Sequence, residues 1–220
     1  MATSVSKVNM NITDRIQQRR IQGDKKLVEK NLKNKDDINF LDIVFFPDEI
    51  HERANGKKGL SVKFLYKGDE DSEFNNGYFL GEVLLHPEYP KKAGDIRMLT
   101  PNGRFEAGKM ICMDNTAFHQ NDMTGGMKAG WNVWTIIMGF ISVWTDEDEN
   151  GIAHMSRGQM KYENKGDIEQ KMKVLRKFRR KSAKDSVAYN AKHYPEYFNK
   201  FTRMIDGYKS HLPSGFKVKT

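Results

Sequence analysis

Cysteine is almost missing from this chain, which has one cysteine, Cys112, in 220 residues. A single cysteine excludes an internal disulfide, and this composition is typical of proteins that fold in a reducing compartment. We therefore expect a cytoplasmic or nuclear location. A lone cysteine is most often a small buried hydrophobic residue. Only its surroundings in the sequence can indicate a chemical role.

Long apolar runs are missing as well. The longest, residues 131–144, is interrupted by polar side chains and falls short of the roughly 20 apolar residues that cross a bilayer. No basic and apolar leader is visible at the N-terminus, so we expect no secretory signal. With 30% charged residues, the chain is expected to be soluble and to lack a membrane anchor.

Positive charge is concentrated in the last part of the chain. Residues 156–220 hold 17 Lys and Arg against 6 Asp and Glu, whereas residues 1–155 hold 20 against 23. A basic region indicates an acidic partner or a solvated helix face, and we expect Arg176, Lys177, Arg179 and Arg180 to be exposed. Single-stranded nucleic acid would require aromatic platforms among these charges. Only Phe178 lies within residues 171–184, so nucleic acid is not an expected partner.

Hydrophobic periodicity divides the chain into helices and strands. The pattern predicts helices at 13–34, 131–144, 168–192 and 197–208, and strands at 40–46, 61–67, 78–85 and 95–99. The short connections between the strands, one with an Asn-Gly pair, favour an antiparallel meander. The fold class is therefore α+β: an N-terminal helix, a four-stranded meander and C-terminal helices. We divide the chain into a flexible arm (1–12), a core (13–200) and a basic C-terminal tail (201–220).

The motifs around Cys112 carry a resemblance to a known family. Cys112 follows Asn102 of the segment Thr100–Phe105 by ten positions. Four further motifs accompany it in order: Gly77-Tyr78, Pro87-Glu88-Tyr89-Pro90, Phe118-His119 and Ser186-Val187-Ala188-Tyr189-Asn190. In this order the motifs resemble the ubiquitin-conjugating enzymes, in particular their endoplasmic-reticulum, tail-anchored branch. Thr100 stands where most of the family has histidine.

The resemblance implies the ubiquitin-conjugating fold and a transferase activity. Cys112 would take ubiquitin from the activating enzyme as a thioester and pass it, with a ligase, to lysine or hydroxyl acceptors on protein substrates. The resemblance implies no cofactor or metal, because ATP is used upstream by the activating enzyme. Two alternatives stay open: conjugation of another ubiquitin-like modifier, and a non-catalytic ubiquitin-binding module of the same fold.

Four residues are the predicted catalytic set. Cys112 is the nucleophile, since a thiolate is a strong nucleophile and a thioester stays reactive toward amines. Asn102 could donate to the oxyanion or brace the turn after Pro101. His119 could assist proton transfer or be an ordinary loop residue. Asp114, two residues after the cysteine, is an acidic group close to it in sequence.

Six residues are predicted to contact partners. They are Arg19, Arg20, His86, Pro87, Lys128 and Ala129. Arg19 and Arg20 contribute to the positive charge of the first helix. The other four stand at positions where the family meets a ligase. Three of these depart from the usual pattern: His86 replaces an apolar residue, and Lys128 and Ala129 belong to Lys128-Ala129-Gly130, which replaces a small polar residue followed by Pro-Ala.

Overall fold

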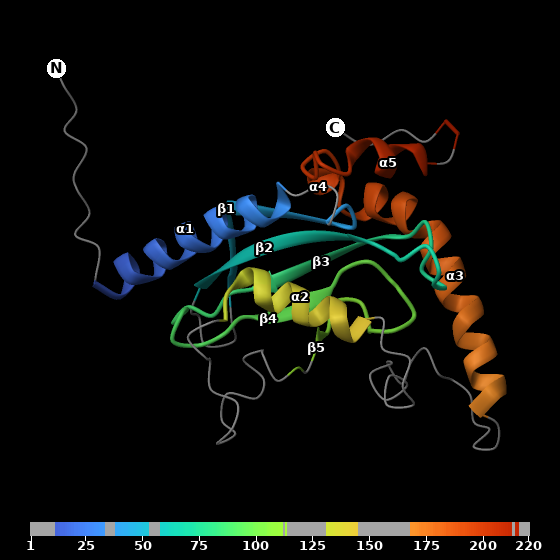
Figure 1. Cartoon of the computed structure of the whole chain (residues 1–220), viewed down its shortest axis with the longest axis horizontal. Coiled ribbons are helices and arrows are strands. Elements are labelled where there is room, and N and C mark those ends of the chain that lie inside the picture. Colours follow the sequence, from blue (N-terminus) through green and yellow to red (C-terminus); the bar gives the residue numbers. More distant parts are fainter. Residues whose placement is uncertain are drawn as a thin grey trace.

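The computed structural model describes residues 12–33, 38–52, 58–111, 113, 131–144, 168–212 and 214–215. Helices and strands follow each other in the predicted order (Figure 1). The helices are α1 (Ile12–Leu32), α2 (Val133–Trp144), α3 (Ile168–His193), α4 (Pro195–Phe198) and α5 (Ile205–Ser210). The strands are β1 (Leu41–Glu52), β2 (Lys58–Lys67), β3 (Tyr78–Leu84), β4 (Asp95–Met98) and β5 (Met110–Ile111). The α+β class and the antiparallel meander are confirmed.

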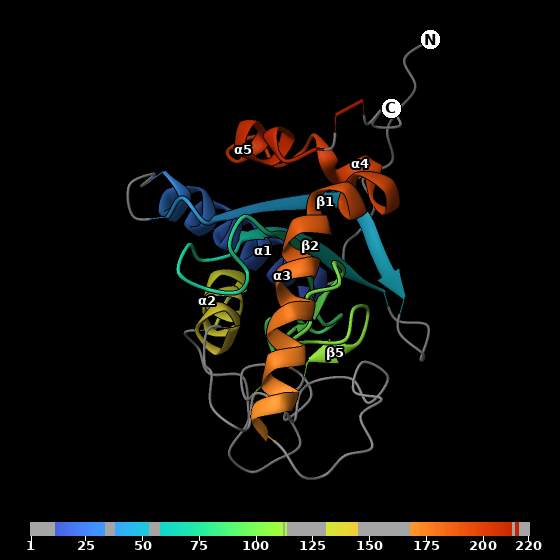
Figure 2. The same cartoon turned by 90° about the vertical axis from the view of Figure 1, so that its right-hand side faces the viewer.

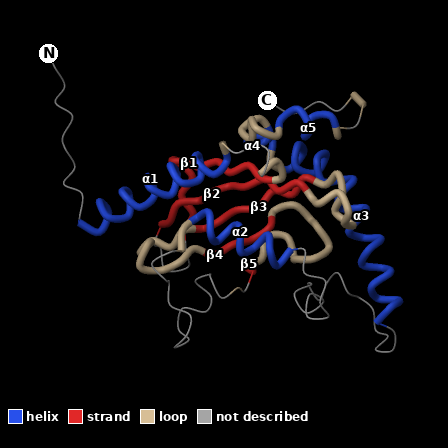
Figure 3. The backbone as a smooth tube through the Cα atoms, in the orientation of Figure 1, coloured by secondary structure: helices blue, strands red, loops and turns tan. Residues whose placement is uncertain are grey.

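The sheet has five strands in the order β1-β2-β3-β4-β5, all antiparallel (Figure 3). The predicted number of four strands was therefore wrong. The fifth strand is two residues long and pairs with β4 through Ile96 with Ile111 and Arg97 with Met110. A two-residue strand leaves no alternating pattern in the sequence, so only the tertiary pairing reveals it.

Strand β1 is longer than the pattern predicted, because it continues beyond residue 46 to Glu52. Its register with β2 shifts between Phe45 and Ile50. Pro47 lies in this irregular stretch, and a proline is tolerated there because β1 is an edge strand. The irregularity interrupts the alternation of side chains, which hides the second half of the strand from a periodicity analysis.

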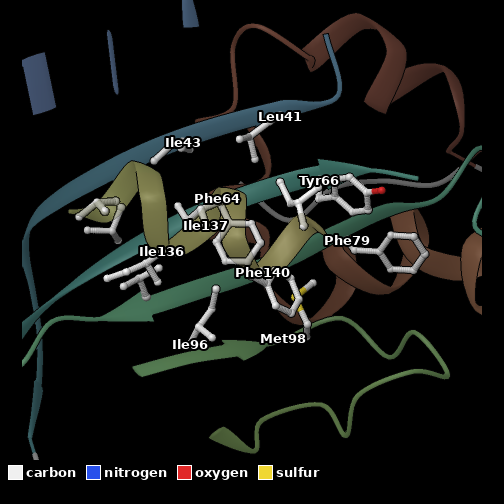
Figure 4. Close-up of a cluster of buried hydrophobic side chains, with 14 of the residues drawn as sticks. Leu41, Ile43, Phe64, Tyr66, Phe79, Ile96, Met98, Ile136, Ile137 and Phe140 are labelled. Atoms are coloured by element: carbon white, nitrogen blue, oxygen red, sulfur yellow. The ribbon is translucent and has the colours of Figure 1, made fainter. Parts of the chain in front are cut away.

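One face of the sheet packs against α2 and forms the main core (Figure 4). Val62, Phe64 and Tyr66 of β2 point to this face, as their alternation predicts, and none is exposed to solvent. Phe140 and Trp144 of α2 meet them edge to face, with ring centroids 5.8 Å apart for Phe64 and Phe140 and 5.3 Å apart for Tyr66 and Trp144. Such aromatic pairs contribute about 0.5–1.5 kcal/mol beyond their buried area.

The opposite face is covered by the C-terminal helices (Figure 2). Leu65 and Leu80 of the sheet are buried against Val187 of α3 and against Phe201 and Tyr208. The helix expected at 197–208 is in fact two short helices, α4 and α5, and the turn between them buries Phe201. The packed part of the chain thus continues past residue 200.

No helix in the described part of the chain is both long and apolar enough to cross a membrane.

Candidate active site

The segment Thr100–Phe105 forms a turn that is held from inside by the side chain of Asn102. This side chain is fully buried. Its Oδ1 accepts the backbone N–H groups of Arg104 (2.8 Å) and Phe105 (2.7 Å), and its Nδ2 donates to the carbonyl of Thr100 (3.0 Å). Two N–H donors require an oxygen, so this network fixes the orientation of the amide. The turn-bracing role considered for Asn102 is therefore present in the geometry.

The turn Thr100–Phe105 contacts both α2 and α3. Arg104 is buried and donates to the carbonyl of Val143 (2.6 Å) in the last turn of α2. Gly103 has φ +77° and lies against Phe178 of α3, where a Cβ would come within 2.6 Å of the ring. Only glycine meets both conditions, the left-handed backbone and the close approach. Contacts with α2 and α3 therefore hold this turn in its conformation.

The burial of Arg179 contradicts one sequence-based prediction. It was expected to be exposed, but its side chain is only 3% exposed. It lies 3.8 Å from a carboxylate oxygen of Glu73 and 5.5 Å from the ring centroid of Phe74. Position 179 lies on the face of α3 that turns toward the body, because Leu175, Ala183 and Ser186 of that face are also buried. Arg179 is thus part of the packed structure.

Thr100 connects the sheet to α3. Its hydroxyl accepts the N–H of Leu80 (2.8 Å) and donates to Oδ1 of Asn190. Asn190 also donates to the carbonyl of Tyr78 (2.8 Å), and the hydroxyl of Ser186 accepts the N–H of Tyr78 (2.8 Å). Ser186 and Asn190 are one helical turn apart, so they meet the start of β3 together. A threonine at position 100 fits here because its small hydroxyl bridges two buried groups.

Five of the predicted site residues lie outside the described residues: Cys112, Asp114, His119, Lys128 and Ala129. The described neighbours of Cys112 are Ile111, which is buried and pairs with Ile96 of β4, and Met113, which packs against the main core. β5 therefore ends directly before Cys112 in the sequence.

A buried junction joins α1, the turn at residues 87–90 and the start of α2. Asp24 of α1 accepts the hydroxyl of Tyr89, forms an ion pair with Arg20 (3.0 Å) and accepts the N–H of Val133 (3.4 Å). Arg20 also donates to the carbonyl of Trp131 (2.6 Å). Burial raises the pKa of Asp24 above its ordinary value, although Tyr89 and Arg20 act in the opposite direction.

Among the predicted partner contacts, the two arginines differ in position. Arg19 is exposed on α1, whereas Arg20 is engaged in this junction. His86 is 9% exposed, and its Nδ1 accepts the N–H of Glu88 (2.9 Å). Pro87 is partly buried, and its carbonyl accepts Nε2 of Gln17 (2.9 Å). α1 thus fixes the turn that carries both residues.

The sequence of this chain is similar to those of several known proteins. The chain is 28% identical over 151 residues to the probable ubiquitin-conjugating enzyme E2 33 of Arabidopsis thaliana, covering 66% of this chain and 53% of that protein. It is 28% identical over 148 residues to the ubiquitin-conjugating enzyme E2 6 of Schizosaccharomyces pombe, covering 67% and 55%. It is 34% identical over 92 residues to the human ubiquitin-conjugating enzyme E2 J1, covering 42% and 28%. The chain resembles the ubiquitin-conjugating enzymes.

The extent of this resemblance is limited in two ways. The matched region spans about half the length of the plant and yeast relatives and 28% of the human one. No family model matches the chain. The resemblance to ubiquitin-conjugating enzymes predicted from the motifs is nevertheless confirmed.

The sequence analysis did not predict a second buried polar cluster, which contains charged residues and lies on the face of the sheet opposite α2. Glu82 of β3 pairs with Lys63 (2.8 Å) and Arg97, and Lys63 lies 4.9 Å from the ring centroid of Tyr197. Burial would raise the pKa of Glu82, but the two cations outweigh it and hold that pKa below the ordinary value. A signal was available in the sequence, because Glu82 is the one charged residue in the otherwise apolar stretch 78–85.

Proposed function

We propose that this chain is a ubiquitin-conjugating enzyme that carries ubiquitin as a thioester on Cys112. The observation that supports this most directly is the buried Asn102 turn, whose sequence and spacing to Cys112 resemble those of the endoplasmic-reticulum branch of the family. The similarity to proteins named ubiquitin-conjugating enzymes supports the same proposal.

The first step is thioester exchange. The thiolate of Cys112 attacks the carbonyl carbon of the ubiquitin thioester on the activating enzyme. The new C–S bond forms as the activating enzyme's thiolate leaves, so no net oxidation occurs. ATP is used only upstream, and this chain supplies the nucleophile.

The second step is discharge onto an acceptor. An amine or hydroxyl attacks the thioester carbon, the oxygen becomes negative in the tetrahedral intermediate, and the Cys112 thiolate leaves. Asn102 bonds the carbonyl of Thr100 through Nδ2, and the second N–H of this amide group is the donor proposed for the oxyanion. Loss of one oxyanion donor typically slows a reaction about 100- to 1,000-fold.

The acceptor loses its proton in this step, and we assign that assistance to His119, with Asp114 nearby in the sequence. A histidine suits transfer near neutral pH because its ordinary pKa is about 6.5. His119→Gln should flatten the pH dependence of discharge near that pKa, most of all for serine and threonine acceptors. An unchanged profile would show that His119 takes no part.

The proposed partner surface has two parts. Arg19 is available on α1 for the activating enzyme, and Arg20 supports it by fixing α1 to Trp131. A ligase would meet the turn at His86 and Pro87 together with Lys128 and Ala129. Because His86 is nearly buried, Pro87 would supply most of the contact on that turn.

A charging assay tests the proposal. Purified chain is mixed with activating enzyme, ATP and ubiquitin and is resolved on gels with and without thiol reagent. We expect a conjugate that the reagent removes, that is lost in Cys112→Ala, and that becomes resistant to the reagent in Cys112→Lys. Parallel reactions with other ubiquitin-like modifiers and their own activating enzymes identify the modifier. A reducible band in Cys112→Ala would refute the assignment of the nucleophile.

A further inference from the structure

Helix α3 carries a row of exposed cations on the side away from the turn that holds Asn102. The row consists of Lys173, Lys177, Arg180 and Lys184, all exposed. Their spacings of four, three and four residues place them on one helix face, within about 60° of each other at 100° per residue. At 1.5 Å per residue this cationic stripe is roughly 16 Å long.

The opposite face of α3 is the buried one. Leu175, Arg179, Ser182 and Ser186 are buried there, and the neighbouring Phe178 approaches Gly103 of the turn. A partner on the cationic stripe would therefore leave the Asn102 turn uncovered. The first half of α3 also runs away from the sheet (Figure 1), so the stripe is presented at the side of the molecule.

The charges of the cationic stripe are not neutralised within the described part of the chain. No ion pair there involves Lys173, Lys177, Arg180 or Lys184, whereas Arg176 pairs with Glu73 (3.1 Å) and Lys181 pairs with Asp185. Four like charges at one-turn intervals repel one another and cost helix stability. An acidic ligand would relieve that repulsion.

The side chains around the cationic stripe decide which acidic ligand fits. Met172, Lys173, Arg176, Lys177 and Arg180 line a hollow on this part of the helix. Met172 is a flexible apolar side chain that adapts to apolar partners, and nucleic acid offers no apolar group of that kind along its phosphates. No aromatic ring lies on the stripe itself to stack a base. Both features favour a polypeptide.

We propose that the cationic stripe of α3 docks an acidic segment of a partner protein, with glutamates or aspartates at one-turn spacing and an apolar residue over Met172. This goes beyond conjugation itself, because it assigns a partner-binding surface that is separate from the Asn102 turn. Its test does not depend on Cys112, so the stripe and the proposed function can fail separately.

The probe is a fluorescein-labelled synthetic helix of about 20 residues, long enough to be helical in water, with Glu at one-turn intervals and a Leu beside them. We expect saturable binding by fluorescence anisotropy that weakens as salt rises. Changing Lys173, Lys177, Arg180 and Lys184 together to Gln should weaken binding by about tenfold or more, because four exposed ion pairs are lost. Met172→Ala should weaken it further.

A matched control removes the same charge elsewhere. Lys25, Lys26 and Lys30 of α1 and Lys33, the residue after that helix, are also exposed. Changing these four to Gln should alter peptide affinity by less than about twofold, because they lie outside the stripe. Reversing the stripe to Glu should create binding to a probe with Lys in place of Glu. Circular dichroism of each variant confirms the fold.

Three outcomes would overturn the proposal. The first is no binding of the acidic probe at low salt. The second is an equal loss of probe affinity in the α1 control, which would show that only the net charge of the protein matters. The third is tighter binding of single-stranded DNA or anionic vesicles than of the peptide, with the same dependence on the stripe. Charging of the stripe variant with ubiquitin should stay normal, since the stripe faces away from the Asn102 turn.

Discussion

At the scale of single residues, Asn102 combines a structural duty with a proposed chemical one. Its Oδ1 accepts the buried N–H groups of Arg104 and Phe105. Its Nδ2 is the group proposed to meet the oxyanion. The two duties use different atoms of one amide, so substitutions can separate them.

Asn102→Ala should lower the melting temperature by about 4 °C or more, because each buried N–H left without a partner costs about 1–3 kcal/mol. It should also slow discharge more than charging. Asn102→Asp keeps an acceptor for both N–H groups and should retain more of the melting temperature, yet it lacks the donor. Discharge by Asn102→Asp at the wild-type rate, measured in single turnover, would remove the oxyanion role.

Two buried carboxylates differ in their local charge. Asp24 has one cation beside it, and burial holds its pKa above 3.8. Glu82 has two cations, and its pKa lies below 4.5 although burial acts against this. The folded state therefore binds the proton of Asp24 more tightly than the unfolded state does, and the proton of Glu82 less tightly.

The two groups should give opposite pH dependences. As pH rises from about 3.8, Asp24 ionises first in the unfolded chain, so its contribution to stability falls until pH passes its raised folded pKa. The contribution of Glu82 is fully present above about 4.5 and is lost as pH falls through its lowered folded pKa. Breaking this buried pair in Glu82→Gln should cost about 3–5 kcal/mol at neutral pH.

Urea unfolding at a series of pH values measures both effects. The stability of wild type minus that of Asp24→Asn should decrease with pH across the carboxylate range. The same difference for Glu82→Gln should increase with pH. If the stability difference between wild type and variant changes with pH in the same direction for both variants, the assigned pKa directions are contradicted.

At the scale of elements, side chains of α3 attach this helix to the sheet by hydrogen bonds to backbone groups. Ser186 accepts the N–H of Tyr78, and Asn190 donates to the carbonyl of the same residue. Asn190 also accepts the Thr100 hydroxyl. The start of β3, the turn at Thr100 and the C-terminal part of α3 therefore form one hydrogen-bonded unit.

Ser186→Ala should destabilise the protein by about 1–3 kcal/mol, because it leaves the buried N–H of Tyr78 unpaired. The matched change is Ser210→Ala on α5, where the serine is exposed, and its effect should stay within about 0.5 kcal/mol. Thermal unfolding of both variants supplies the comparison. Similar losses for the two serines would show that the Ser186 bond contributes nothing specific.

At the scale of the whole molecule, the segment after α3 closes the outer face of the sheet. Phe201 and Tyr208 are 1% and 2% exposed. Arg203 donates to the carbonyls of Leu41 (2.7 Å) and Ile38 (2.8 Å), and its own N–H reaches the carboxylate of Asp42 (3.1 Å). The C-terminal helices are thus joined to the first strand of the sheet.

Phe201→Ala should cost about 3–5 kcal/mol, since it removes a fully buried aromatic side chain. Ile16→Ala on α1 is the reference, because Ile16 is 50% exposed, and should stay within about 0.5 kcal/mol. Chemical denaturation measures both values. A small loss at Phe201 would mean that the sheet is stable without this covering segment.

The order of the elements, the antiparallel meander and the resemblance to ubiquitin-conjugating enzymes could be predicted from the amino-acid sequence alone. These depend on local signals: the alternation of Val62, Phe64 and Tyr66, the break at Pro195, and the spacing of Asn102 and Cys112. Each of these signals lies within a stretch of about ten residues, so it can be recognised without knowing what packs against it.

The fifth strand, the burial of Arg179 and the bond between Thr100 and α3 could be found only from the three-dimensional structure. Each depends on partners far away in sequence: Ile96 for Ile111, Glu73 for Arg179, and Asn190 for Thr100. A charged or short polar segment has the same local pattern whether water or a distant residue satisfies it. The choice is made when folding brings those partners together, because a buried charge or N–H group is stable only when it is paired.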